Sequence, residues 1–520
     1  TSITIGSTTL TSDTGDTDIF VAKLSANGQW LWAIQAGGEN EDCSLAIALD
    51  SNGDVYISGW FTGWQGGPTF GGTTFTGVGD GFVAKIDSDG NWVWAIAIGG
   101  SSGSDTEKVH GMVILGTSIY ITGEFSSSTV NFGGYSLTRN SAGIGSDIFV
   151  AKLSSYGSWQ WAVEAGGPRG DVGKSIAVDG SGNTYITGYF YAESATFGSI
   201  SITPYGGFDG FVAKLSSSGS WQWAINVGST GGDQGNAITV DSSGNSYITG
   251  EFAGTATFGS TTLISEGNID VYVGKLSSSG SWVWITSGGG PDFDRPHTIA
   301  LDPFGNVYIT GFFNEYATFG PSDLIGGPTS NLFVAKLSSD SGLWYEAFSS
   351  EASSGTGIDF DYYGNIYIGA GKSIVFTNTD ADGDNVPDIN DIFVYEGSQF
   401  ADQDGDGFGD NTLGYHGDSC PTVFGNSWQD RWGCPDMDFD GQSDLNDAYM
   451  QNPTQWNDSD GDGLGDNWDG TIVDRNGSTN GIGEYWPNAY LSDPSPLDYD
   501  NDGFEDENLA SIGASGPFDD

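Results

Sequence analysis

The stretch that decides the fold is DIFVAKL at Asp18–Leu24, because close variants of it return through the first 376 residues. The variants are GFVAKI at Gly81–Ile86, DIFVAKL at Asp147–Leu153, GFVAKL at Gly210–Leu215, VYVGKL at Val271–Leu276 and LFVAKL at Leu332–Leu337. Their lysines are 62, 67, 62, 61 and 61 residues apart: Lys23, Lys85, Lys152, Lys214, Lys275 and Lys336. A fixed period above about 20 residues indicates a repeat architecture such as a solenoid or a propeller.

Each repeat has the pattern of several short strands. A turn and a Trp-x-Trp pair follow the anchor, and the spacing of two places both indoles on one face of a strand. The pairs are Trp30/Trp32, Trp92/Trp94, Trp159/Trp161, Trp221/Trp223 and Trp282/Trp284. An apolar strand, a Gly-Asn turn, a Tyr-Ile-Thr-Gly segment and an ATFG segment complete the unit, as at Ala256–Gly259. Turn residues between alternating apolar runs predict hairpins, and four to five strands per repeat are typical of a propeller blade.

Both ends of the repeat array lie inside a repeat. Ile3–Leu10 matches the ATFG segment, and the array ends after Ile366–Gly369 and Ile374–Phe376. The two partial repeats add up to one, so we expect residues 356–376 and 1–37 to form a shared blade that closes a six-bladed ring and hides its edges. The predicted fold is therefore all-β, with a β-propeller over residues 1–377 and a loop-rich segment over residues 378–520.

These units resemble a family of bacterial and archaeal β-propeller repeats with the signature DIFVAKL…WxWA…GNxYITG. The resemblance covers about residues 1–376. The family is named for seven blades, whereas we count six repeats, so the blade number stays open. The resemblance implies an extracellular or cell-envelope setting and little about activity.

The charge of the chain is strongly negative, with 68 acidic and 14 basic residues and a net charge of −54. This excludes a basic nucleic-acid-binding surface and electrostatic attraction to an anionic membrane. There is no run of 18 apolar residues that could form a transmembrane helix. After Phe376, 33 acidic residues face only Arg431 and Arg475, a net charge of −31. Such a segment repels itself unless cations neutralise it.

The acidic segment contains five loops in which Asp recurs at alternate positions. Three loops have carboxylates at positions 1, 3, 5, 9 and 12: Asp380, Asp382, Asp384, Asp388 and Asp391; Asp436, Asp438, Asp440, Asp444 and Asp447; and Asp458, Asp460, Asp462, Asp466 and Asp469. Two loops lack the last carboxylate: Asp402, Asp404, Asp406 and Asp410; and Asp498, Asp500, Asp502 and Asp506. Ca²⁺ takes about six to eight hard oxygen ligands, and alternating Asp on a tight loop can supply them. The loops therefore predict several bound Ca²⁺ ions.

The loops resemble thrombospondin type 3 repeats over about residues 380–510. The resemblance implies a secreted or cell-surface protein in which Ca²⁺ ions form much of the core of this segment. The chain departs from the family in its irregular loop spacing and its single cysteine pair, Cys420 and Cys434, which can form a disulfide in an exported protein. The alternative is a disordered acidic tail.

The sequence contains no G-x-S-x-G, H-E-x-x-H, P-loop or dinucleotide-binding motif. The anchor lysines recur in every repeat, which indicates a structural role, and we expect them to pair with recurring aspartates at Asp42, Asp171, Asp233 and Asp294. The Trp pairs are expected to pack between blades, although stacking on sugars is an alternative.

Three functional hypotheses follow. The first is a non-enzymatic, secreted or cell-surface, calcium-binding structural and interaction protein of the adhesion type, with surface proteins, glycans or copies of itself as partners. The second is a subunit of an extracellular filament or sheath, in which the acidic segment of one copy docks on the propeller of the next. The third is a glycan-active enzyme that uses the propeller channel. It predicts one blade with histidines or carboxylates that the others lack, and Lys108 and His110 mark the candidate blade.

Overall fold

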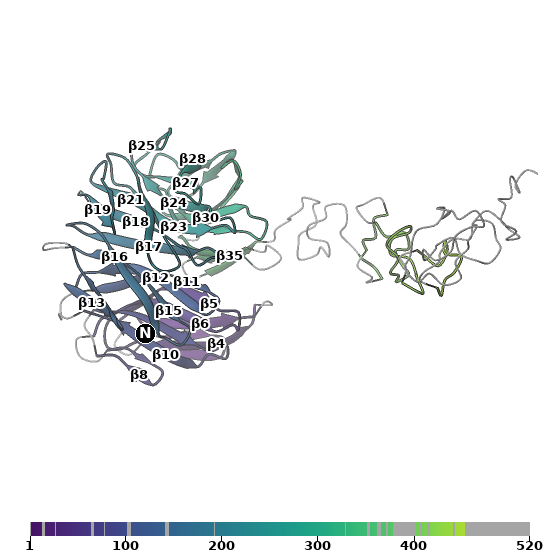
Figure 1. Cartoon of the computed structure of the whole chain (residues 1–520), viewed down its shortest axis with the longest axis horizontal. Coiled ribbons are helices and arrows are strands. Elements are labelled where there is room, and N and C mark those ends of the chain that lie inside the picture. Colours follow the sequence, from purple (N-terminus) through teal and green to yellow (C-terminus); the bar gives the residue numbers. More distant parts are fainter. Residues whose placement is uncertain are drawn as a thin grey trace, which may run out of the picture. The chain divides into compact units, whose positions relative to one another are not determined.

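The computed structural model divides the chain into two compact units, residues 1–362 with 366–376, and residues 363–365 with 377–520. Of residues 1–377 it describes 2–12, 16–25, 28–63, 67–76, 79–100, 106–140, 145–191, 193–327, 329–350, 354–360, 366–370 and 373–377. Of residues 378–520 it describes 402–404, 408–412, 417–439 and 442–452. The described part of the first unit is built from strands and turns (Figure 1).

Five antiparallel four-stranded sheets form the blades of the first unit. In chain order their strands are β5 (Asp42–Leu49), β6 (Val55–Phe61), β9 (Gly81–Ile86) and β10 (Trp92–Ile98); β11 (Glu107–Leu115), β12 (Ser118–Phe125), β15 (Asp147–Ser154) and β16 (Trp159–Ala165); β17 (Asp171–Val178), β18 (Thr184–Tyr191), β21 (Phe208–Leu215) and β22 (Trp221–Val227); β23 (Gln234–Val240), β24 (Ser246–Phe252), β27 (Asp270–Leu276) and β28 (Trp282–Gly288); and β29 (Arg295–Leu301), β30 (Val307–Phe313), β33 (Asn331–Leu337) and β34 (Trp344–Ser350).

The first strand of each blade packs against the first strand of the next, in the series β5, β11, β17, β23 and β29. These five strands are the innermost strands of the array. The Trp-x-Trp pairs lie on the fourth, outermost strands. Every blade therefore presents its first strand to a common axis, around which a channel can form.

Two smaller sheets lie at the ends of the array. One pairs β3 (Ile19–Leu24) with β4 (Trp30–Ala36), and the other has the order β35 (Gly355–Phe360), β36 (Ile366–Ala370), β37 (Ser373–Thr377). The expected shared blade requires β36 to pair with β3, but β37 occupies that edge of β36. The physical reason is local: β37 follows β36 almost directly along the chain, so it closes a far shorter loop than β3 would. The structure thus has two separate end sheets where we expected one.

A small two-stranded hairpin accompanies each repeat, formed by the ATFG segment and the residues after it. The hairpins are β1 (Ser2–Ile5) with β2 (Thr8–Thr11), β7 (Thr69–Phe70) with β8 (Thr73–Thr74), β13 (Thr129–Phe132) with β14 (Tyr135–Thr138), β19 (Ala195–Phe197) with β20 (Ile200–Ile202), β25 (Thr255–Phe258) with β26 (Thr261–Ile264), and β31 (Tyr316–Phe319) with β32 (Ser322–Ile325). In β19–β20 the turn needs glycine, because Gly198 has φ of 59° and a Cβ there would lie 2.9 Å from Trp221.

The two tryptophans of each pair have different structural roles. The first packs edge-on against the Phe of the small hairpin, as Trp221 does against Phe197 with ring centroids 5.0 Å apart. The second donates a hydrogen bond to the next blade, as Trp223 Nε1 does to the Ser278 carbonyl at 3.2 Å. Equivalent bonds join Trp32, Trp94, Trp161 and Trp284 to Ser88, Ser155, Ser217 and Ser339. The expectation of packing between blades is confirmed for this second Trp.

The anchor lysines are structural, but the predicted pairing with Asp42, Asp171, Asp233 and Asp294 is wrong. The lysine of each complete blade lies over the Tyr ring of its Tyr-Ile-Thr-Gly strand or the equivalent, as Lys214 does over Tyr185 at 4.8 Å from the centroid. Lys214 also donates to the same Ser278 carbonyl as Trp223. The lysine and the recurring aspartate lie at opposite ends of the blade, because their strands run antiparallel. This geometry keeps them apart.

The recurring aspartates instead hold the loops at the other end of each blade. Asp171 is almost fully buried and accepts hydrogen bonds from the amides of Gly167 at 2.6 Å and Tyr191 at 3.2 Å. Burial raises the pKa of Asp171 to about 7 against the effect of these bonds, and the charge of Asp147 adds to the rise. The same cause, burial, raises the pKa of Asp42 and of Asp294 to about 7.

Candidate functional site

The predicted metal-binding aspartates belong to the second unit, and part of them lie outside the described residues. Those outside are Asp380, Asp382, Asp384, Asp388, Asp391, Asp406, Asp440, Asp458, Asp460, Asp462, Asp466, Asp469, Asp498, Asp500, Asp502 and Asp506. The described ones are Asp402, Asp404 and Asp410 of one loop and Asp436, Asp438, Asp444 and Asp447 of another.

The two partly described loops share a hydrogen bond at equivalent positions. The amide of Gln403 donates to Asp410 Oδ1 at 3.0 Å, and the amide of Met437 donates to Asp444 Oδ1 at 2.8 Å. Each bond joins position 2 of the loop to the carboxylate at position 9. The sequence repeat is therefore also a repeat of local conformation.

The carboxylates of the loop at 436–447 lie near one another. Burial raises the pKa of Asp447 to about 6, and the charges of Asp438, Asp436 and Asp444 raise it further. A hydrogen bond from the backbone amide of Tyr449 acts in the opposite direction. Both carboxylate oxygens of Asp438 are buried. Among the described residues, no three His, Cys, Asp or Glu side chains are grouped tightly enough to hold a metal. Carboxylate oxygens are nevertheless the donors that a hard cation such as Ca²⁺ takes.

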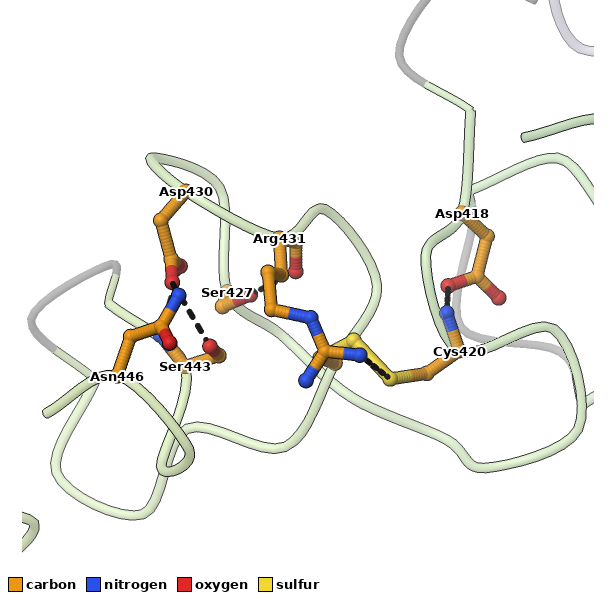
Figure 2. Close-up of a disulfide and its surroundings, with 8 residues drawn as sticks. Asp418, Cys420, Ser427, Asp430, Arg431, Ser443 and Asn446 are labelled. Atoms are coloured by element: carbon orange, nitrogen blue, oxygen red, sulfur yellow. Dashed lines mark hydrogen bonds between the residues drawn. A yellow bond between two sulfur atoms is a disulfide. The ribbon is translucent and has the colours of Figure 1, made fainter. Parts of the chain in front are cut away.

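A disulfide and a cluster of side-chain hydrogen bonds organise the chain around this loop (Figure 2). Cys420 and Cys434 are bonded to each other, with Cα atoms 5.1 Å apart. Asp430 accepts hydrogen bonds from the amide and hydroxyl of Ser443, both at 2.8 Å, and from the Asn446 side chain at 2.6 Å. These contacts fasten the loop to the segment that the disulfide closes.

A second candidate site lies in the first unit, at a β-bulge that recurs on the innermost strand of each blade. The register of β17 against β18 skips one residue between Gly173 and Ser175, and β5, β11, β23, β29 and β35 of the end sheet skip a residue at the equivalent place. A bulge leaves one residue without an opposing partner and redirects its side chain. The six bulge residues are Leu45, His110, Lys174, Asn236, His297 and Thr356.

Five of the six bulge residues line a single cavity of about 400 Å³ between the innermost strands of the blades, which we call the channel. The lining is Leu45, His110, Lys174, Asn236 and His297, joined by Gln234, Glu251 and Arg295. The lining comes from the five four-stranded blades, and the bulge position holds Leu in one blade, Lys in one, Asn in one and His in two. The rest of the blade repeats closely, whereas this position varies. The variation indicates a site that is not part of the repeated architecture.

A hydrogen-bond chain connects the polar residues of the channel across neighbouring blades. The ammonium of Lys174 donates to Gln234 Oε1 and, at 3.0 Å, to Asn236 Oδ1. The Gln234 amide donates to Glu251, whose other oxygen lies 3.1 Å from Arg295 Nε. Burial lowers the pKa of Lys174; the charge of Glu251 acts in the opposite direction, and that of Arg295 adds to the lowering. The chain fixes two cations around one carboxylate.

Two histidines complete the channel wall. His297 Nδ1 lies 3.0 Å from the Gly355 carbonyl, so this nitrogen carries the proton and Nε2 is the acceptor of the neutral ring. Burial lowers the pKa of His297, and the hydrogen bond to the Gly355 carbonyl acts in the opposite direction. His110 Nε2 lies 3.3 Å from Glu124 Oε1. Burial acts to raise the pKa of Glu124, but the hydrogen bonds from His110 and Ser146 and the charges of His110 and Lys108 hold it below its usual value.

The sequence expectation singled out Lys108 and His110, and the structure places His110 in the channel wall. Sequence reasoning missed Lys174, Gln234, Asn236, Glu251, Arg295 and His297. The signal that could have found them is present in the repeats: the third residue after the recurring aspartate is Leu45, Lys174, Asn236 or His297. A position that varies while its neighbours repeat marks these residues.

The comparisons with known proteins agree with this architecture. Residues 160–189 and 222–251 match the model of the SBBP family, described as a beta-propeller repeat. The first unit is built from β-propeller repeats. Each matched segment runs from the second Trp of one blade's outermost strand (Trp161 or Trp223) to the Tyr-Ile-Thr-Gly strand of the following blade.

Two curated relatives match the chain over part of their length. The regulatory protein FlaEY of Caulobacter vibrioides is 26% identical over 317 residues, covering 57% of this chain and 32% of that protein. The uncharacterized WD repeat-containing protein L264 of Acanthamoeba polyphaga mimivirus is 24% identical, covering 59% of this chain and 27% of that protein. The chain thus spans about a third or less of the length of these relatives.

Solved structures that match the chain include the WD40 propeller domain of Doa1 and the Dos1 propeller. The first has a TM-score of 0.40 and 10% identity, and covers 70% of this chain and 88% of that chain. The second has a TM-score of 0.36 and 10% identity, and covers 69% and 72%. Among the residues that the structure describes, no helix has the length and apolar character needed to cross a membrane.

Proposed function

We propose that the protein is a non-enzymatic, secreted or cell-surface interaction protein whose propeller binds a ligand at its channel. The observation that carries the proposal is the ring of bulge residues. Every blade repeats its architectural side chains, yet the bulge residue of the five complete blades varies among Leu, His, Lys and Asn, and all five of these residues line one cavity. An asymmetric polar site on a symmetric scaffold is typical of ligand recognition.

The acidic second unit is proposed to be a calcium-stabilised module of the thrombospondin type 3 kind. Its support is the loop spacing, the conformation shared by the loops at 402 and 436, and the neighbouring aspartates whose charges act on Asp447. The described residues Asp436, Asp438, Asp444 and Asp447 would hold an ion together with Asp440. The charge of the ion would offset the repulsion among these carboxylates.

A glycan-active enzyme is the alternative, and His110 beside Glu124 in the channel region is the observation that favours it. Glycoside hydrolysis needs one carboxyl group with a raised pKa as the general acid and a second carboxylate across the bond. The pKa of Glu124 is lowered, and Glu251 is paired with Arg295. Neither carboxylate has the environment of a general acid, so the geometry supports binding better than hydrolysis.

A test uses the labelled full-length protein on arrays of glycans and peptides. The channel variant carries Lys174→Met, Arg295→Met and His297→Gln, and the control carries Arg169→Gln, an exposed cation paired with Glu193 away from the cavity lining. The proposal expects wild type and control to bind the same probes and the channel variant to lose them. Binding that survives in the channel variant, absence of binding by the wild type, or cleavage of a bound probe seen by mass spectrometry would contradict it.

A head-to-tail filament remains a further proposal for the same protein, supported by the opposite charges of the acidic second unit and the cationic channel. Electron microscopy of the full chain with and without a chelator separates monomers from fibres.

A further inference from the structure

The channel contains more fixed positive charge than its own side chains neutralise. Lys174 and Arg295 face one carboxylate, Glu251, which forms an ion pair with Arg295. The Lys174 ammonium donates hydrogen bonds to two neutral amide oxygens, those of Gln234 and Asn236, and lies 5.4 Å from the centroid of the Tyr189 ring. Among the described residues, Lys174 forms no ion pair with a carboxylate. A positive charge held inside a protein without a counter-charge is costly, so the site favours an anion.

The arrangement of donors specifies the anion further. Arg295 pairs with Glu251 through Nε and its side chain is 39% exposed, so the terminal amino groups of the guanidinium can face the channel. A guanidinium and a neighbouring ammonium match the planar, bidentate geometry of a carboxylate. The excess is a single charge, and a phosphate dianion would place a second negative charge beside Glu251. A singly charged anion therefore suits the site better.

The remaining polar groups can serve hydroxyl groups of the same ligand. His297 Nδ1 is directed to the Gly355 carbonyl, so Nε2 presents an acceptor lone pair. A cavity of about 400 Å³ is large enough for one sugar ring or a short-chain acid. Hydroxyl groups placed around a carboxylate are what such a wall can recognise.

From these contacts we infer that the channel binds a small hydroxylated monocarboxylate, such as a sugar acid, with its carboxylate held by Lys174 and Arg295 and a hydroxyl group donating to His297. The inference rests on the proposed function, because it names the ligand chemistry of the same channel.

The experiment is isothermal titration calorimetry of the full-length protein with glucuronate, with glucose as the neutral probe and acetate as the carboxylate without hydroxyl groups. The inference expects glucuronate to bind more tightly than acetate, and glucose not to bind. Lys174→Met and Arg295→Met should each weaken glucuronate binding about tenfold or more, the order expected for losing a hydrogen bond to a charged group. Arg169→Gln should leave the affinity unchanged.

Arg295→Lys keeps the positive charge but loses the planar guanidinium that can bind a carboxylate with two hydrogen bonds. It should therefore weaken binding less than Arg295→Met does. Circular dichroism melting of each variant shows that it is folded before titration. Equal binding of glucose and glucuronate, no binding of glucuronate, or unchanged affinity in both Met variants would overturn the inference. If array probes still depend on the channel while glucuronate does not bind, the proposed function stands and the inference fails; if neither glucuronate nor any array probe depends on the channel, both fail.

Discussion

At the residue scale, an aspartate that recurs in several blades makes the stability of the repeat depend on pH. Asp42, Asp171 and Asp294 are buried at the ends of their blades, and each has a pKa raised to about 7 from 3.8. Burial disfavours the charged carboxylate, and the amide hydrogen bonds from the loop only partly compensate. The folded propeller therefore binds protons more tightly at these positions than the unfolded chain does.

The pH dependence of stability follows from this direction. A carboxyl group whose pKa is raised on folding stabilises the folded state fully below about pH 4, and this contribution is lost as the pH rises through about 7. We expect the melting temperature of the propeller to fall between about pH 5 and pH 7, and Asp171→Asn to flatten part of this fall. Calorimetry across this range checks it, with exposed Asp89→Asn as the control. A slope that is identical in Asp171→Asn and wild type would refute the assignment.

At the element scale, the blades are joined by side chains that sequence periodicity located correctly. The Trp-x-Trp spacing predicted two indoles on one strand face, and the structure assigns one to the small hairpin and the other to the next blade. The strands themselves could be predicted because turn residues and alternating apolar residues recur with a fixed period. The lysine partners could not, because the sequence does not show which ends of antiparallel strands meet.

The hydrogen bond between blades has a measurable contribution. Trp223→Phe removes the donor to the Ser278 carbonyl, and we expect the free energy of unfolding to fall by about 1 kcal/mol more than in Trp221→Phe. Trp221 is the matched control, because its ring packs against Phe197 within the same repeat. Denaturant unfolding monitored by fluorescence measures the difference. Equal losses in the two variants would show that the bond adds nothing beyond ring size.

The channel site illustrates why sequence reasoning stopped short. His110 was recognisable because its repeat diverges, but Lys174 and His297 lie in repeats that otherwise look ordinary. Only the bulge, which is a feature of hydrogen-bond register, shows that these side chains occupy one equivalent position and face a common cavity. Register cannot be deduced from composition or from turn residues alone.

At the scale of the whole first unit, the separate end sheets leave apolar residues at the start of the repeat array exposed. Phe20 on β3 is 52% exposed, whereas its equivalent on β15, Phe149, is fully buried. The expected ring closure failed to appear because the sequence count added two partial repeats without considering that β37 could complete the sheet of β36 locally. The sequence pattern predicts the number of strands but not which strands pair with each other.

The exposure of Phe20 gives a direct test of the end sheets. Phe149→Ala should cost about 3–5 kcal/mol, as expected for a fully buried aromatic ring, and Phe20→Ala should cost clearly less. Chemical denaturation of the two variants compares them. Equal costs would show instead that Phe20 is buried by a closed ring.

Calcium removal tests the second unit of the full-length chain. Since clustered carboxylates repel one another without a cation, EDTA should speed proteolysis of residues 377–520 and leave the propeller fragment intact. Added Ca²⁺ should restore protection, and Asp438→Asn should lower the number of bound ions while Glu396→Gln, outside the loops, should not. Protection that is unchanged by EDTA, or no bound calcium in metal analysis, would disprove the calcium assignment.

The central claim is that the bulge residues serve binding while the repeated residues serve the fold. The measurement that tests it most directly compares melting temperature and ligand binding in two full-length variants, His110→Ala/Lys174→Ala/His297→Ala at the bulges and Thr187→Val at a repeated position whose hydroxyl donates to the Phe211 carbonyl at 2.7 Å. The account predicts that the bulge variant loses binding with a melting temperature within about 4 °C of wild type, and that Thr187→Val melts lower but still binds. A bulge variant that unfolds, or one that binds as the wild type does, would contradict it.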